Sequence, residues 1–193
     1  MVIACLVTIF SFTVFTNAGL SFPQEASAAD PHDQHKIFDR IILTWKENPA
    51  TSQAVTWRSP VRFDKSVAEI APAGASPNFV KNARQILAET SLLKIDNKFV
   101  YYHSVNFTDL SPSTLYAYRV GNGDIWSEWF QFRTASNQAE PFSFLYFGDA
   151  QKNIFSLWSR TIRTAILKSP EARFMIHAGD MVEHKNNGYP ACR

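Results

Sequence analysis

The sequence has few cysteines and almost no net charge. Its 193 residues include only two cysteines, Cys5 and Cys192, and 19 basic residues against 17 acidic ones. Cys5 lies in an apolar N-terminal segment, so the rest of the chain has one thiol and no internal disulfide. The small positive charge is only weak evidence for a nucleic-acid partner, and none is expected. No internal repeat or low-complexity run is present, and the hydrophobic content of 46% is ordinary for a globular protein.

The first 29 residues also lack lysine and arginine. Met1 to Leu20 is almost wholly apolar, and Ala26-Ser27-Ala28 follows it with the small-x-small pattern of a signal-peptidase site. We therefore expect residues 1–29 to be a signal peptide and the protein to be secreted, at the cell surface or periplasmic. No membrane span is expected after the signal is removed. Because the positively charged start of a signal is missing, a retained membrane anchor is the alternative.

Residues 36–134 are predicted to form a β-sandwich. Short strand-like runs recur there, separated by turn residues at Asn48-Pro49, at Pro72 to Pro77 and at Gly121 to Asp124. The candidate strands are residues 41–45, 53–58, 67–71, 92–95, 100–107, 115–120 and 129–133.

A proline turn leads into one of these strands at Leu110-Ser111-Pro112-Ser113-Thr114-Leu115-Tyr116, and strict alternation follows. Tyr116 stands where a tyrosine corner would place it, so this region resembles a fibronectin type III domain. In such a domain Trp57, on the second strand, is a core residue, and Tyr116 hydrogen-bonds through its hydroxyl across the corner. We expect structural roles for both.

Residues 135–141 are polar and end in proline, so we interpret them as a linker, and a second domain is expected from Phe142. Two apolar runs follow, Phe144 to Asp149 and Phe174 to Asp180, and each ends in glycine-aspartate. Between them, residues 153–168 carry apolar side chains at the three- and four-residue spacing of an amphipathic helix. The pattern predicts a βαβ unit with two buried parallel strands.

This unit would bring Asp149 and Asp180 to one edge of a sheet. A right-handed crossover makes the strands parallel, so their carboxyl ends meet at the edge where ligands bind in α/β sheets. Neighbouring strands lie about 4.8 Å apart, which lets the two carboxylates reach one metal ion or a pair of ions. Gly148 and Gly179 are expected to allow a sharp backbone turn before each carboxylate.

The glycine-aspartate segments, Gly148-Asp149-Ala150-Gln151 and Gly179-Asp180-Met181-Val182-Glu183, resemble the first two motifs of the calcineurin-like metallophosphoesterases. The preceding sandwich, with Asn48 to Trp57, narrows the resemblance to the purple acid phosphatases and their bacterial relatives. It covers residues 36 to 185. The fold class it implies is a fibronectin type III-like β-sandwich followed by the first βαβ unit of an α/β metallophosphoesterase domain.

The resemblance implies that Asp149 binds one metal ion and that Asp180 bridges two. Fe, Zn or Mn suit such oxygen and imidazole ligands. The implied substrate is a phosphate ester, and the expected reaction is hydrolysis of phosphate monoesters, as in acid phosphatases. Hydrolysis of phosphodiesters or nucleotides by the same superfamily is an alternative, and a non-catalytic binding module is another. No oligomeric state is predicted.

Two positions depart from the family pattern. Gln151 stands where purple enzymes carry glycine and many other members carry a metal-binding histidine; it is interpreted either as a ligand or as a hydrogen-bonding neighbour of one. Glu183 replaces the tyrosine that colours the purple enzymes, so that absorption band is expected to be absent. Glu183 is either a ligand or a solvated loop carboxylate. His177 and His184 match no ligand position and are expected to be structural.

The other motifs of the family are not in this sequence. They comprise an asparagine-histidine motif and further histidines, which the resemblance places beyond Arg193, so no catalytic residue is assigned within the chain. Residues 142–193 hold only one βαβ unit, and such a fragment buries too little surface to fold well alone. We therefore expect the second domain to be truncated and the 193-residue chain by itself to be inactive or nearly so.

Overall fold

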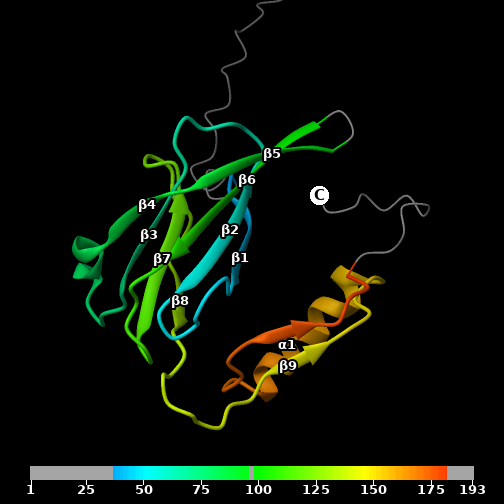
Figure 1. The fold of residues 1–193 in the computed structure, drawn as a ribbon. Coiled ribbons are helices and arrows are strands. Elements are labelled where there is room, and N and C mark those ends of the chain that lie inside the picture. The colour runs from blue at the N-terminus through cyan, green and yellow to red at the C-terminus, as the bar shows by residue number, and fades with distance from the viewer. Residues whose placement is uncertain (1–36, 96–97, 182–193) are drawn as a thin grey trace, which may run out of the picture.

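The computed structural model describes residues 37–95 and 98–181, which form a β-sandwich followed by a small unit of strands and helix (Figure 1). The first sheet of the sandwich has the strand order β1-β2-β6-β5, and every neighbouring pair is antiparallel. Its strands are β1 (Asp39–Thr44), β2 (Gln53–Ser59), β5 (Glu89–Ile95) and β6 (Lys98–Phe107).

The second sheet packs against the first and is also antiparallel, with the order β4-β3-β7-β8. Its strands are β3 (Val67–Pro72), β4 (Arg84–Leu87), β7 (Leu115–Gly121) and β8 (Phe130–Arg133). The prediction of a sandwich in this region is confirmed. Each of the seven predicted strands overlaps an observed one.

The core between the sheets is built from the inward-facing residues of both. Val55 and Trp57 of β2 face Ile70 of β3 and Val120 of β7, and all four are essentially inaccessible to solvent. Burying such large apolar side chains is the main force that holds two sheets together. The predicted core role of Trp57 is therefore confirmed.

The tyrosine corner is confirmed as well. Tyr116 is buried at the start of β7, and its hydroxyl oxygen accepts a hydrogen bond from the backbone N–H of Ser111 at 2.9 Å. The bond fixes the turn through Pro112 against the second sheet, because it satisfies a backbone donor that the turn would otherwise leave unpaired.

Two elements of the sandwich were not predicted. β4 is a four-residue edge strand in which only Ile86 is partly buried, so it has no alternating pattern to detect. A 3-10 helix, η2 (Pro77–Asn82), begins where the sequence suggested only a turn. Ser76 caps it by accepting from the backbone N–H of Asn78, and proline occupies its first position, both common at helix starts.

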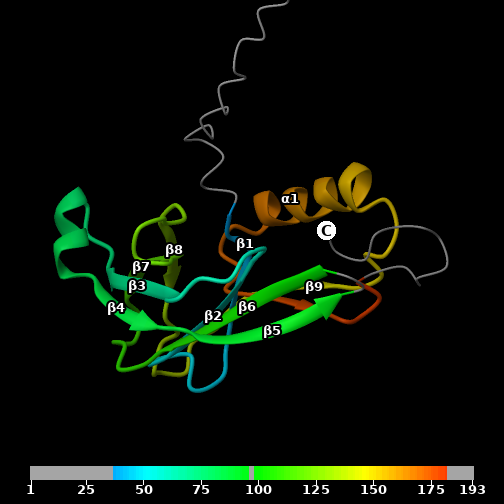
Figure 2. The ribbon, with the colours of Figure 1, turned by 90° about the horizontal axis from the view of Figure 1, so that it is seen from above.

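After the sandwich, β9 (Leu145–Phe147) and β10 (Met175–His177) pair in parallel, and α1 (Ser159–Lys168) lies between them in the chain. The helix covers one face of the two strands (Figure 2). The predicted helix began at Asn153, but Asn153 is left-handed (φ 52°) and residues Ile154–Trp158 form a π-helical turn before α1.

The prediction that these two strands are buried is wrong for the described residues. Tyr146 is 67% exposed and its neighbour Ile176 is 43% exposed, although both lie within the strands. The reason is that Trp158, from the π-helical turn, packs on one face of the pair, against Phe147 and His177. In the described part of the chain nothing covers the opposite face.

Within residues 37–95 and 98–181, no helix is both long and apolar enough to span a membrane.

Candidate metal site at the edge of the parallel strands

Asp149 and Asp180 follow the carboxyl ends of β9 and β10. The two segments stay side by side beyond the strands: Ala178 N–H donates to the Phe147 carbonyl at 2.7 Å, and Asp149 N–H donates to the Gly179 carbonyl at 3.3 Å. Both aspartates are exposed to solvent. Two carboxylates thus leave the same edge of the strand pair, from adjacent segments.

The two aspartates also share a backbone conformation. The φ angle is 54° at Asp149 and 53° at Asp180, in the left-handed region that few residues other than glycine adopt. Aspartate tolerates this region because its short polar side chain can hydrogen-bond locally. Strained backbone of this kind is often found at functional sites. The two aspartates therefore follow their strands with the same backbone conformation.

Only one of the two glycines turns as expected. Gly179 has a φ of 103°, which a residue with a Cβ atom rarely adopts. Gly148 has no positive φ, and a Cβ added there would make an ordinary contact of 3.7 Å with Ala178. The expectation for Gly148 is therefore wrong, because Asp149 itself makes the turn after β9.

Gln151 lies beside Asp149. Its side-chain Nε2 donates to Oδ1 of Asp149 at 2.7 Å. This contact matches the hydrogen-bonding role considered for Gln151. The ligand role would instead require its amide oxygen, Oε1, which is the other terminal atom of the side chain. The amide would have to turn before that oxygen could take the place next to the carboxylate.

His177, at the end of β10, is tied into the strand unit. Its Nδ1 accepts from the backbone N–H of Gly179 at 3.3 Å, and the ring meets Trp158 edge-on, with 5.7 Å between centroids. Nδ1 therefore carries no proton, and the proton is on Nε2, which is buried and has no partner among the described residues. These contacts orient the chain just before Asp180.

Among the described residues, no group of three or more His, Cys, Asp or Glu side chains is close enough to hold a metal ion. Asp149 and Asp180 therefore supply at most part of a metal site in this part of the chain. Glu183, His184 and Arg193 lie outside the described residues. The expectation that the remaining ligands and catalytic residues follow Arg193 stays a prediction, as does the ligand role considered for Glu183.

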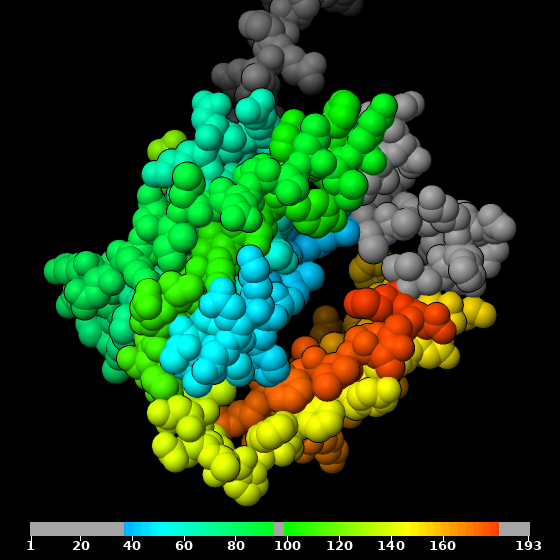
Figure 3. Space-filling model, viewed as in Figure 1, coloured from blue at the N-terminus to red at the C-terminus, as the bar shows by residue number. Residues whose placement is uncertain are grey.

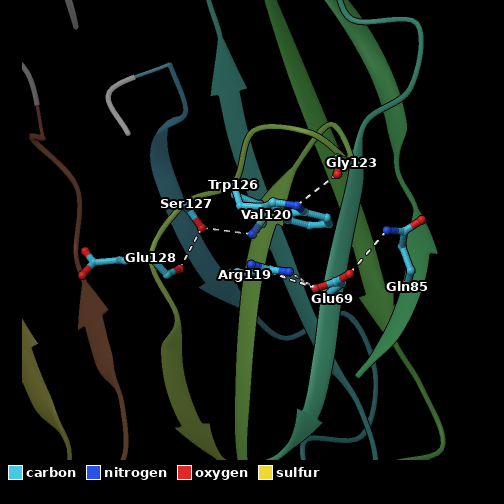
Figure 4. A network of polar contacts seen from close by, with 8 residues as sticks. All are labelled: Glu69, Gln85, Arg119, Val120, Gly123, Trp126, Ser127 and Glu128. Carbon is cyan, nitrogen blue, oxygen red and sulfur yellow. Dashed lines mark hydrogen bonds and ion pairs between the residues drawn. The ribbon is translucent and has the colours of Figure 1, made fainter. Parts of the chain in front are cut away.

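A polar cluster on the outer face of the second sheet was missed by sequence reasoning (Figure 4). Arg119 on β7 pairs with Glu69 on β3 at 2.7 Å, and its guanidinium lies over the rings of Trp126 at 4.2 Å and Trp129 at 4.7 Å. Gln85 donates to the same glutamate at 3.4 Å. The spacing of the two tryptophans, with serine and glutamate between them, was the available signal. The cluster ties β3, β7 and the segment before β8 together.

A buried histidine in the first sheet was also missed. His103 on β6 lies between the hydroxyls of Ser59 at 2.8 Å and Thr90 at 2.9 Å. Ser59 Oγ donates to the Val61 carbonyl, so it accepts from Nε2–H of His103, and Nδ1 accepts from Thr90. Burial lowers the pKa of His103 to about 4, because the charged ring cannot be hydrated there. This neutral ring is a structural bridge between β2, β6 and β5.

Comparisons with known proteins bear on the sandwich. The family model for "Purple acid Phosphatase, N-terminal domain" matches residues 38–134, which is half of the chain. No curated protein matches the chain. Among solved structures, the chain is similar to Astrotactin-2, described as a vertebrate-specific, perforin-like membrane protein involved in neuronal development. The two share 15% sequence identity with a TM-score of 0.37, and the match covers 51% of this chain and 22% of the other.

Purple acid phosphatases are metallophosphatases, hydrolases that use two metal ions. The match to their N-terminal domain covers the whole sandwich, including Trp57 and the Tyr116 corner. The chain therefore belongs to the purple acid phosphatase family.

Proposed function

We propose that residues 142 onward begin a calcineurin-like metallophosphoesterase domain and that Asp149 and Asp180 belong to its dinuclear metal site. The reaction proposed is hydrolysis of phosphate monoesters. The protein is proposed to act after export, in a secreted, cell-surface or periplasmic location. The family match to the sandwich supports the reaction class, and the paired carboxylates carry the proposal for the site.

The observation that carries the site is the equivalence of the two aspartates. They follow adjacent parallel strands, have the same left-handed backbone and are joined through the Asp149 N–H to Gly179 carbonyl bond. In sheets of this kind, ligands bind outside the carboxyl ends of the strands. Solvent exposure of both carboxylates leaves them accessible to an ion and to a phosphate ester.

The chemistry of the donors fits a metal in part. Carboxylate oxygens are suitable ligands for Fe, Zn or Mn, and they offset the cation's charge. A turn of the Gln151 amide would add its Oε1 as a third oxygen donor, but it would also break the hydrogen bond from Nε2 to Asp149. When bound, two metal ions would activate a water molecule and stabilise the negative charge that develops on the phosphoryl oxygens.

Contacts within the chain already restrain the segments that carry the two carboxylates at this edge of the strand pair. Gln151 holds the Asp149 carboxylate through Oδ1 and leaves the other oxygen for a cation. His177 anchors the Gly179 N–H, and Gly179 provides the turn that places Asp180 next to Asp149. These contacts reduce the freedom that the two carboxylates would lose on binding an ion.

Binding of inorganic phosphate to the Zn²⁺-loaded chain tests the proposal by titration calorimetry. Phosphate is expected to bind only when the metal is present, and either Asp149→Asn or Asp180→Asn should abolish this binding. Dimethyl phosphate, an inert diester with one negative charge fewer, is expected to bind more weakly. Equal binding of phosphate with and without metal would overturn the proposal, and a preference for dimethyl phosphate would favour a phosphodiesterase.

A further inference from the structure

Trp45 is an exposed tryptophan whose orientation is fixed by a buried residue. It follows β1 and is 47% exposed, outside the core of the sandwich. Its Nε1–H donates to Oε1 of Gln53 at 3.2 Å, and Nε2 of the same glutamine donates to the Thr44 carbonyl at 2.8 Å. Gln53 is only 6% exposed. The sandwich thus uses both ends of a buried amide to hold an indole that does not belong to its core.

The other partner of Trp45 is an aromatic cluster at the start of the parallel strands. Phe174 meets the indole edge-on, with 4.9 Å between ring centroids. Phe144 stacks on Phe174 at 5.1 Å with the ring planes 6° apart, and Phe142 lies 5.7 Å away. Phe144 precedes β9 and Phe174 precedes β10, so this phenylalanine cluster (Phe142, Phe144 and Phe174) marks the amino ends of both strands.

We infer that Trp45, by packing against the phenylalanine cluster, anchors the β9–β10 unit to the sandwich and sets the orientation of that unit. The backbone offers no alternative within the described residues, because β9 and β10 form a sheet of their own and no sandwich strand pairs with either. Figure 3 shows the blue to cyan part of the sandwich touching the orange residues near the start of β10, with open space beside the contact. A polar linker alone would leave the two parts free to rotate.

The geometry gives the anchor a specific consequence. The Trp45 contact lies at the amino ends of the strands, whereas Asp149 and Asp180 follow the carboxyl ends, beyond about 10 Å of strand. The sandwich therefore holds the unit at one edge and leaves the other open. Because the indole is already fixed by Gln53, little rotamer freedom is lost when it meets Phe174. This inference does not depend on a metal or on catalysis.

Residual dipolar couplings of backbone amides in the 193-residue chain test the inference. In the wild type, couplings from residues 38–134 and from residues 145–177 are expected to fit one common alignment tensor. In Trp45→Ala the common tensor should be lost and two separate tensors should be needed. Trp45→Phe, which keeps an aromatic ring, should restore part of the common alignment. Trp129→Ala removes an indole from the Arg119 cluster instead and should leave the common tensor intact.

A second variant keeps the test decisive if Trp45→Ala disturbs the sandwich. Phe174→Ala changes no residue of the sandwich and should also separate the two tensors, while the amide shifts of residues 38–134 stay within the wild-type pattern. A single tensor in Phe174→Ala, or two tensors in the wild type, would overturn the inference. Mn²⁺ affinity should be unchanged in both variants, so failure of the anchor and failure of the metal site give different results.

Discussion

The side chain of Gln151 donates a hydrogen bond to the carboxylate of Asp149, with 2.7 Å between Nε2 and Oδ1. The position two residues after the first motif aspartate is thus in direct contact with that aspartate. A ligand at this position would share an ion with Asp149. In this chain an amide occupies the position, and its donor end faces the carboxylate.

Gln151→His is expected to tighten Zn²⁺ binding about tenfold or more, because a neutral imidazole is a stronger zinc ligand than an amide oxygen. The measurement is isothermal titration of the wild type and the variant with Zn²⁺ at pH 7.5. Gln138→His serves as the matched control, since it makes the same substitution at an exposed residue between β8 and β9. Equal affinities for the wild type and Gln151→His would show that residue 151 does not face a bound ion.

Tyr116→Phe should destabilise the sandwich by about 1–2 kcal/mol, because it leaves the Ser111 N–H without its acceptor at a partly buried position. Urea unfolding followed by circular dichroism measures the change. Tyr146→Phe removes the hydroxyl of an exposed tyrosine on β9 and should change the free energy of unfolding by less than about 0.5 kcal/mol. If Tyr116→Phe left the free energy of unfolding unchanged, the hydrogen bond of the corner would contribute nothing to stability.

Gly121→Ala is expected to cost about 1–3 kcal/mol or more through overpacking. A Cβ at this position would lie 2.3 Å from the Ile125 carbonyl oxygen and 2.7 Å from the ring of Trp126, and the backbone oxygen cannot move aside cheaply. Thermal unfolding compares it with Gly74→Ala, where the added atom meets only Phe79 at 3.9 Å. Equal melting temperatures for the two variants would contradict the close approach of the Trp126 segment to β7.

The stability of the sandwich should fall with acid because of His103. Its folded-state pKa of about 4 is below the ordinary value of 6.5, so the unfolded chain binds a proton more readily than the folded one between these values. The contribution of the neutral His103 ring to the free energy of unfolding is complete above pH 6.5. It is lost as the pH falls toward 4, a loss of about 3 kcal/mol in total.

Urea unfolding at several pH values between 4 and 7.5 measures this dependence. His103→Gln cannot titrate, so its curve should be flatter in the same window even though its overall stability is lower. If the wild type and His103→Gln lose stability in parallel, the buried ring is not the group responsible.

The sandwich was predictable where one local signal was strong. Trp57 and Tyr116 were identified because the proline turn and the alternation after it resemble a fibronectin type III domain, in which each has one structural role, and the structure confirms both. β4 was not found because a short edge strand with one partly buried residue has no alternation. His103 was missed because its role depends on Ser59 and Thr90, which are far from it in sequence.

The candidate site was predictable only in outline. The Gly-Asp pattern located both aspartates, and the structure shows that their segments run side by side. The left-handed turn at Asp149, in place of Gly148, depends on how the chain leaves the strand and has no sequence signal. The strands were expected to be buried because they are apolar, but burial also requires something to cover the second face, and an apolar run does not show whether that cover is present.

The most direct test of the account is whether Asp149 and Asp180 bind the same ion. Mn²⁺ added to the ¹⁵N-labelled chain broadens the amide signals of residues near the ion. The account predicts selective broadening of residues 148–151 and 178–181 together, abolished by Asp149→Asn and by Asp180→Asn alike. Broadening centred elsewhere, or broadening that survives in either variant, would contradict a shared metal site.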